Sequence, residues 1–136
     1  MPVRYQIDPR HRTIRTQCIG QVTLAEVIDH FRTLAQDPRC PDHLDVFLDL
    51  SQMNSLPEGR EISAVITELK RVRSKVRFDA CAILVSGDAQ FGMMRVFEVQ
   101  GEQFFRLIRT FRIAAEAEAW LTSQQSLAAR EQAADT

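Results

Sequence analysis

The sequence lacks the features that place proteins outside the cell or in a membrane. It has three cysteines among 136 residues, Cys18, Cys40 and Cys81, odd in number and irregularly spaced. We therefore expect no disulfide framework and predict a reducing compartment. The N-terminus has no apolar segment of the kind found in signal peptides. No apolar run approaches the ~20 residues that a transmembrane helix needs. These absences predict a cytoplasmic protein with no transmembrane segment.

A charge excess of either sign is also missing. The 17 Lys and Arg residues nearly balance the 18 Asp and Glu residues, and the net charge is -1. The molecule as a whole therefore has no electrostatic preference for nucleic acids or anionic membranes. One basic run extends from Lys70 to Arg77, at the end of an expected helix, where the helix dipole favours cations. Because no aromatic residue is interleaved in it, nucleic-acid binding is not expected.

What the sequence does contain is an alternation of strand and helix patterns over one domain, residues 3–122. Two strands with β-branched and alternating apolar residues, joined by a turn at 8–11, predict an N-terminal hairpin. The expected elements are strands at 3–7, 13–19, 44–50, 78–85 and 107–111, and helices at 24–35, 56–72, 89–104 and 115–125. This order predicts an α/β fold with a mixed β-sheet, parallel later strands and helices packed on the sheet. Residues 126–136 are expected to form a flexible C-terminal tail.

The third strand, 44–50, is expected to be covered on both faces. Val46, Leu48 and Leu50 fall on one face and Phe47 on the other. Such a pattern is typical of parallel strands with helices on both sides. The strand at 78–85 is nearly all apolar and indicates a central strand for the same reason.

Acidic residues flank Phe47 on the same face of this strand. Asp45 and Asp49 could serve acid/base chemistry or bind a cation. Alternatively, Asp49 accepts hydrogen bonds from loop amides and Asp45 is solvated. No histidine or nucleophile accompanies them at a catalytic spacing, so the structural interpretation is favoured and no enzyme is predicted. Cys40 and His43 have the spacing of half a zinc site, but no second pair completes it. No metal and no cofactor are expected.

Two helix starts carry capping-box patterns. Thr23 with Glu26 precedes the first helix, and Ser55 with Glu58 precedes the second, with Pro57 in the first turn. A phosphate on Ser55 would be stabilised by the free amides of a helix N-terminus. The capping box, however, explains Ser55 and Glu58 together and is the favoured interpretation.

The helix at 89–104, with Asp88 as its expected N-cap, is more apolar than a surface helix needs to be. One of its faces carries Met93, Val96, Phe97, Gln100 and Phe104, and another carries Phe91, Met94 and Glu98. The surplus of Met and Phe indicates a second contact, such as a subunit interface, a groove wall or a ligand pocket. Alternatively, the domain wraps this helix more deeply. Both interpretations stay open.

Three short segments resemble the SpoIIAA-like (STAS/SEC14-like) family. They are Leu-Asp-Leu-Ser at 48–51, Arg-Thr-Phe-Arg at 109–112 and Glu-Ala-Glu-Ala-Trp-Leu at 116–121. The resemblance implies a STAS-like fold and non-enzymatic partner binding, with small or lipidic ligands in some members. Phosphorylated members carry an Asp-Ser pair followed by Gly before the second helix. This sequence has Asn54-Ser55 there, so phosphorylation of Ser55 does not carry over. Ser51 is a weaker candidate of the same kind.

The function predicted from the sequence is that of a non-catalytic STAS-like interaction or regulatory module that forms a homodimer. Its expected partner or ligand surface comprises Phe91, Met93, Met94, Phe97, Asp49, Ser51 and Ser55. The alternative is a carrier of a small molecule or lipid, with a pocket between the third helix and the sheet lined by Phe91, Met94 and Phe97. A third alternative is an enzyme, which a deep pocket that holds Asp49 beside a histidine would favour, but the sequence shows no catalytic set.

Overall fold

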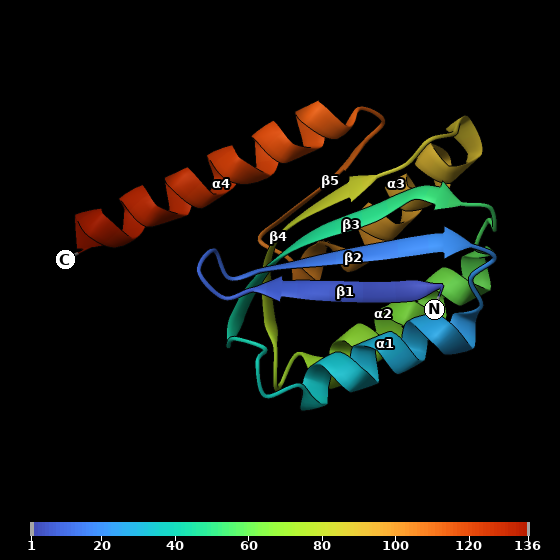
Figure 1. The fold of residues 1–136 in the computed structure, drawn as a ribbon, viewed down its shortest axis with the longest axis horizontal. Helices are drawn as coiled ribbons and strands as arrows, with labels where there is room; N and C mark the ends of the chain where they lie inside the picture. Colours follow the sequence, from blue (N-terminus) through green and yellow to red (C-terminus); the bar gives the residue numbers. More distant parts are fainter. Residues whose placement is uncertain (1, 136) are drawn as a thin grey trace.

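The computed structural model describes residues 2–135, with side chains for residues 2–127. Five strands form one sheet, and four α-helices pack on it (Figure 1). The strands are β1 (Val3–Asp8), β2 (Thr13–Gly20), β3 (His43–Met53), β4 (Arg77–Leu84) and β5 (Leu107–Phe111). The helices are α1 (Leu24–Gln36), α2 (Gly59–Val72), α3 (Asp88–Gly101) and α4 (Ala114–Asp135), with a 3₁₀ turn at Glu102–Phe104.

The strand order in the sheet is β1-β2-β3-β4-β5. β1 and β2 form the predicted antiparallel hairpin, and every later pair is parallel. The chain always steps in the same direction across the sheet, so right-handed crossovers place α1, α2 and α3 on one face. The last helix, α4, covers the other face (Figure 1). The predicted mixed α/β fold is confirmed.

β3 presents side chains to both faces, as its pattern predicts. Val46, Leu48 and Leu50 point toward α1, α2 and α3, where they join the large core cluster of that side. Phe47 joins the cluster under α4. We call these two sides of the sheet the cavity face and the α4 face.

The α4 face is packed with small side chains at its centre. Ala80 and Ala82 on β4 meet Ala117 on α4, and all three are fully buried. Their small size lets the helix axis approach the sheet closely, so larger neighbours interdigitate around them. Those neighbours are Phe47, Leu84, Phe111 and Leu121.

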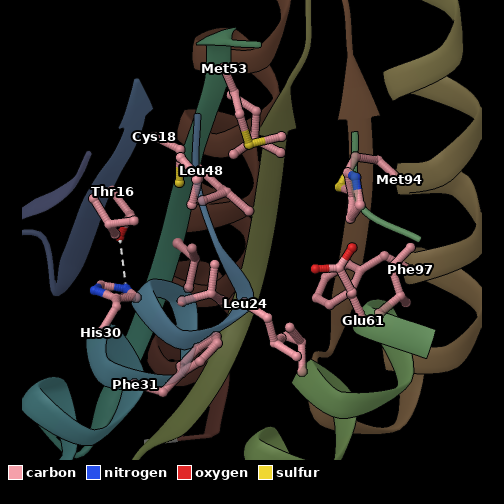
Figure 2. Close-up of a pocket in the computed structure, with 18 of the residues that line it drawn as sticks. Thr16, Cys18, Leu24, His30, Phe31, Leu48, Met53, Glu61, Met94 and Phe97 are labelled. Atoms are coloured by element: carbon pink, nitrogen blue, oxygen red, sulfur yellow. Dashed lines mark hydrogen bonds between the residues drawn. The ribbon is translucent and has the colours of Figure 1, made fainter. Parts of the chain in front are cut away.

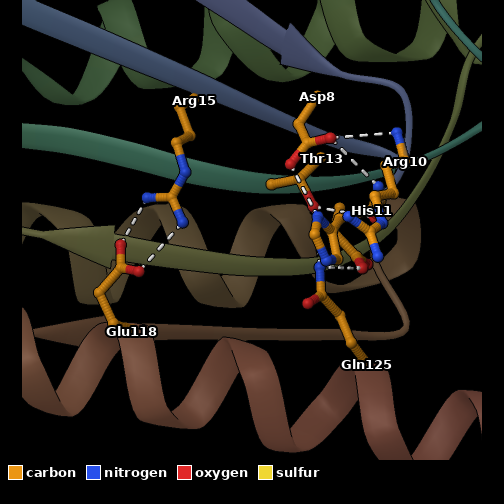
Figure 3. Close-up of polar contacts among 8 residues, drawn as sticks. Asp8, Arg10, His11, Thr13, Arg15, Glu118 and Gln125 are labelled. Atoms are coloured by element: carbon orange, nitrogen blue, oxygen red, sulfur yellow. Dashed lines mark hydrogen bonds and ion pairs between the residues drawn. The ribbon is translucent and has the colours of Figure 1, made fainter.

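Polar contacts hold α4 against the N-terminal part of the sheet. Arg15 on β2 donates through both terminal guanidinium nitrogens to Glu118, the longer bond being 3.0 Å (Figure 3). The guanidinium carbon of Arg15 also lies 5.0 Å from the centre of the Phe47 ring, a cation–π distance. Two turns further along α4, the Gln125 amide donates to the Thr13 hydroxyl at 2.8 Å (Figure 3). The helix is therefore oriented by side chains 80 or more positions away in the sequence, since Gln125 also bonds Asp45.

The predicted capping box at Ser55 is wrong. α2 begins at Gly59, Glu58 is its N-cap, and Glu61 completes the box by accepting from the Glu58 N–H at 2.9 Å. Pro57 lies before the helix rather than in its first turn. The Glu58/Glu61 pair has the same spacing as Ser55/Glu58, so the two patterns look alike in the sequence. The Ser55 hydroxyl instead bonds the Val22 main chain. The Thr23/Glu26 box before α1 is confirmed.

Two other boundaries differ from the prediction. Gly87 is the N-cap of α3, and Asp88 is its first residue, where it pairs with Arg112 at 2.6 Å. A carboxylate in the first turn is stabilised by the helix dipole, so Asp88 keeps a favourable place. α4 continues to Asp135 rather than ending near residue 125. The flexibility expected of 126–136 stays a prediction, and most of its side chains lie outside the described ones.

Asp45 is half-buried and hydrogen-bonded, whereas the sequence predicted a solvated side chain. The register of β3 and β4 shifts between Leu44 and Val46, and there the Asp45 carboxylate accepts from the Ala80 N–H at 3.0 Å. The carboxylate thus satisfies a main-chain donor at an irregular point in the ladder. Burial, the largest cause, raises the pKa of Asp45.

Candidate ligand-binding cavity

A cavity of about 190 Å³ lies between the sheet and the helices of the cavity face. Its walls come from β2 and β3, from the inner sides of α1 and α2, and from one edge of α3 (Figure 2). The contributing side chains are mostly aliphatic, aromatic or thioether groups. Those labelled in Figure 2 include Leu24, Phe31, Leu48, Met53, Met94 and Phe97.

The cavity explains why inward-facing residues stay partly accessible. Val46 and Leu48 lie on the central strand β3, with strands on both sides and helices above, yet both are only half-buried. On α1, only Leu34 is buried, whereas Val27 and Phe31 face the same way and are half-buried. At these residues the helices and the sheet are not in full contact, and the cavity lies between their side chains.

One polar pair interrupts the apolar wall. The Thr16 hydroxyl oxygen and His30 Nε2 lie 3.4 Å apart and join β2 to α1 at one side of the cavity (Figure 2). The His30 ring packs edge-on against Tyr5, with centroids 5.2 Å apart, and tilts against Phe31 at 5.4 Å. Burial lowers the pKa of His30 to about 4, so the imidazole is neutral at pH 7.

The lining residues that are also exposed indicate where the cavity opens. Thr23 precedes α1, and Leu56, which is 49% exposed, precedes α2. Both belong to loops that leave the carboxyl ends of β2 and β3, the edge where α/β folds commonly bind ligands. The opening therefore lies between the N-terminal ends of α1 and α2.

Ser55 ties these two loops together at the mouth of the cavity. Its hydroxyl accepts from the Val22 N–H at 3.1 Å and donates to the Val22 carbonyl at 3.3 Å. A phosphate on Ser55 would remove the bond to the Val22 carbonyl, because the esterified oxygen can no longer donate. The contact explains this serine structurally and leaves its phosphorylation untested.

The structure separates the residues of the predicted surface. Met94 and Phe97 line the cavity, and Ser55 lies at its mouth. Phe91 and Met93 are half-buried against the same core without lining the cavity, and the Arg112 guanidinium lies 4.5 Å from the centre of the Phe91 ring. The buried edge of α3 therefore combines residues that the two predicted faces had kept apart.

Asp49 and Ser51 lie outside this group. Asp49 points to the α4 face with Phe47, and its carboxylate accepts from the Ser51 N–H at 2.9 Å and from the Ser51 hydroxyl at 2.6 Å. This arrangement fits the predicted structural role of Asp49, with the acceptor satisfying a loop amide. The histidine in the cavity is His30, on the opposite side of the sheet from Asp49. Asp49 and His30 therefore do not form an acid/base pair.

The cysteines are free thiols. Cys18 and Cys81 are buried, and Cys40 is half-buried. Burial raises the pKa of Cys18 to about 11 and also raises that of Cys81, so neither is a reactive thiolate at neutral pH. Among the described residues, no three His, Cys, Asp or Glu side chains gather where they could hold a metal ion.

Sequence reasoning missed the α1 wall and its histidine. The signal was present, because Val27, His30, Phe31 and Leu34 recur at the spacing of one helix face. Thr16 likewise alternates with apolar neighbours on β2, facing the same side as Ile14 and Cys18. Thr16 and His30 are polar residues at inward-facing positions, and this pattern could have indicated a polar contact in an otherwise apolar wall.

Of the helices in the described part of the chain, none combines the length and apolar character that crossing a membrane requires. No protein-family model matches the chain, and no curated protein matches it at a significant level.

Proposed function

We propose that this chain is a non-catalytic binding protein that holds a small, mainly apolar ligand in the cavity between the sheet and α1, α2 and α3. The observation that carries the proposal is the cavity itself, with about 190 Å³ of space bounded mainly by apolar side chains. A cavity of similar size lined by apolar residues in another protein takes up benzene.

Filling this space is energetically favourable for two reasons. The ligand leaves water, and the wall atoms regain the dispersion contacts that the void denies them. Cavity-forming substitutions in other cores cost about 24 cal/mol per Å³ of void. By that measure, occupation of the whole cavity of about 190 Å³ is worth at most about 5 kcal/mol. The gain is smaller where the open mouth already admits solvent. The opening between α1 and α2 gives such a ligand a path that does not require unfolding.

Native mass spectrometry of gently purified protein tests this function. The expected result is an added mass on the wild-type chain that is absent from Leu48→Phe, which places a larger ring in the cavity. The control is Leu127→Phe, the same exchange at a 47% exposed site on α4, which should keep the added mass. A wild-type chain with a clean apo mass, and with no rise in Tm when millimolar toluene or p-cresol is added, would contradict the proposal.

A second candidate function is a homodimeric STAS-like interaction module. Its support is the outer side of α3, where Val96 is 39% and Val99 is 70% exposed beside Leu107 at 43%. Arg95, Glu98, Glu102 and Arg106 surround a shallow hollow there. Charges of both signs around an apolar centre suit a second copy of the same surface. Such a dimer is compatible with ligand binding, since this side of α3 points away from the cavity.

The dimer has a direct test in sedimentation at high micromolar concentration. Wild-type protein should sediment as a dimer, and Val99→Lys should sediment as a monomer with an unchanged circular dichroism spectrum. Wild-type protein that remains monomeric rejects this function. The three free thiols support the further proposal of a cytoplasmic location.

A further inference from the structure

We infer that the cavity ligand is a neutral molecule about the size of one six-membered ring, with a single hydroxyl or carbonyl oxygen that hydrogen-bonds to Thr16 and His30. This inference rests on the proposed function and names the chemical class that the cavity selects. Three features lead to it, namely the volume of the cavity, its polar pair and its charges.

The volume limits the size of the ligand. A cavity of about 150 Å³ accepts benzene in another protein, and this one has about 190 Å³. The difference leaves room for roughly one or two further heavy atoms. The ring is favoured over a flexible chain because it loses little conformational freedom on binding. Phe31 and Phe97 offer aromatic surfaces, and the Met53 and Met94 thioethers can adapt to the edge of a ring.

The polar pair fixes one end of the ligand. Thr16 is only 3% exposed, and its hydroxyl contacts His30 Nε2 at 3.4 Å, beyond the 2.5–3.2 Å that is usual for good hydrogen bonds. A buried hydroxyl with one long bond has unused capacity, since it can donate once and accept twice. A ligand oxygen beside the pair would accept from one group or donate to the other at a better distance. The contacts of His30 with Tyr5 and Phe31 hold its ring in place.

The charges of the cavity disfavour an anionic ligand. Among the lining residues that the structure describes, there is no Lys or Arg to pair with a carboxylate or phosphate. The ionisable groups that line it are Cys18, Cys81, His30 and Glu61, and Tyr5 packs against His30. Burial keeps the His30 imidazole and the Cys18 thiol neutral at pH 7, because it lowers the pKa of the former and raises that of the latter. Burial raises the pKa of the Cys81 thiol, so it too is neutral at pH 7. Glu61 is bound to the Glu58 N–H near the mouth. An anion in this cavity would be buried without a partner, which is strongly unfavourable.

Titration calorimetry with three matched probes at pH 7.5 tests the inference. The probes are toluene, p-cresol, which adds one hydroxyl, and p-toluate, which replaces the hydroxyl by a carboxylate. We expect p-cresol to bind about 2- to 10-fold more tightly than toluene, the range expected for one net hydrogen bond. Binding of p-toluate should be weaker than that of either neutral probe.

Substitution at Thr16 locates the preference. Thr16→Val removes the hydroxyl at constant shape and should abolish the advantage of p-cresol over toluene, and Thr16→Ser should restore it. Thr67→Val, the same exchange on the exposed side of α2, should leave the advantage intact. If Thr16→Val does not fold, the His30 imidazole ¹⁵N signals of wild-type protein give the same answer. They should shift with p-cresol and not with toluene.

The outcomes separate the inference from the function on which it rests. Equal affinities for toluene and p-cresol, or tightest binding of p-toluate, overturn the ligand class and leave apolar ligand binding in place. Failure of all three probes to bind overturns both. An advantage of p-cresol that survives Thr16→Val overturns the role of the polar pair.

Discussion

The two faces of the sheet are covered by helices in different ways. On the α4 face, Ala80, Ala82 and Ala117 are fully buried and bring helix and sheet into close contact. On the cavity face, larger side chains such as Leu48 and Phe31 face one another and remain half-buried around a void. Small residues at a helix–sheet contact thus give dense packing, whereas large residues on helices held apart leave space.

The two faces therefore make different contributions to the molecule, one to packing and the other to ligand binding. On the dense α4 face, each buried group has neighbours on all sides, so its packing contributes in full to stability. The cavity face gives up part of that stability in exchange for a site that can hold a ligand. Four measurements can break or sharpen this division.

Truncating a leucine on each face should give unequal losses. Leu121→Ala, at a site only 3% exposed under the α4 face, should lower the free energy of unfolding by about 3 kcal/mol, as expected for a filled core. Leu24→Ala, at a half-buried site lining the cavity, should cost about 1 kcal/mol because little packing is lost. Urea denaturation of both variants measures the pair. Equal losses would mean that the two faces are packed alike.

The two faces should also respond oppositely to acid. Burial lowers the pKa of His30 to about 4 from 6.5, so the unfolded chain binds more protons between these values. Stability on the cavity face is therefore complete above pH 6.5 and is lost as pH falls toward 4, by about 3 kcal/mol at 1.4 kcal/mol per pKa unit. Burial raises the pKa of Asp45 above 3.8. Its contribution is complete below 3.8 and is lost as pH rises through the raised value.

Unfolding free energies measured from pH 4 to pH 7 test the effect of His30. Wild-type protein should gain stability across this range, and His30→Leu should remove most of the gain. The same exchange at exposed His43 should leave the pH dependence unchanged. A His30→Leu protein with the wild-type profile would show that His30 is not buried as the cavity requires.

Added volume should be tolerated on one face only. Ala82→Leu introduces bulk where nothing can move aside and should cost about 2 kcal/mol. Leu48→Phe, on the neighbouring strand but facing the cavity, should change stability by less than about 1 kcal/mol because the ring enters empty space. Thermal unfolding distinguishes them. A large loss from Leu48→Phe would argue against a persistent cavity.

The smallest effect concerns the mouth of the cavity. Ser55→Ala removes both bonds to Val22 and should cost about 1 kcal/mol, as for a typical hydrogen bond. Hydrogen exchange should quicken at the Val22 amide and nowhere on the α4 face. Ser63→Ala, which removes an exposed bond to a carbonyl in α2, should be close to neutral. Unchanged protection of Val22 in Ser55→Ala would show that the two loops are held by other contacts.

Much of this architecture follows from the sequence, because its signals are local. The alternation around Phe47 predicts both faces of β3, and Thr23 with Glu26 predicts the start of α1. The strand Leu107–Phe111 is predicted to the residue. In each case, neighbours in the chain determine the outcome.

The features that sequence analysis missed depend on distant partners. Ser55 matches a cap pattern, but its hydroxyl is taken by Val22, 33 positions earlier. The sequence predicts a solvated Asp45, but a register shift between β3 and β4 places the Ala80 N–H within hydrogen-bond distance of its carboxylate. The cavity itself is set by how far α1 and α2 stand from the sheet. That distance depends on side-chain contacts across the whole face, which no local pattern encodes.

The void beneath α1 and α2 should also affect the volume change of unfolding, and therefore the response of the protein to pressure. Unfolding eliminates internal voids, and it typically contracts a protein in water by roughly 20 to 100 mL/mol, scaling with the void removed. Compression should therefore unfold this protein more readily than its resistance to heat or urea suggests, because the part of the cavity that water does not fill is lost when the helices separate from the sheet. A molecule seated in that space would remove the contraction and make the fold resistant to hydrostatic pressure.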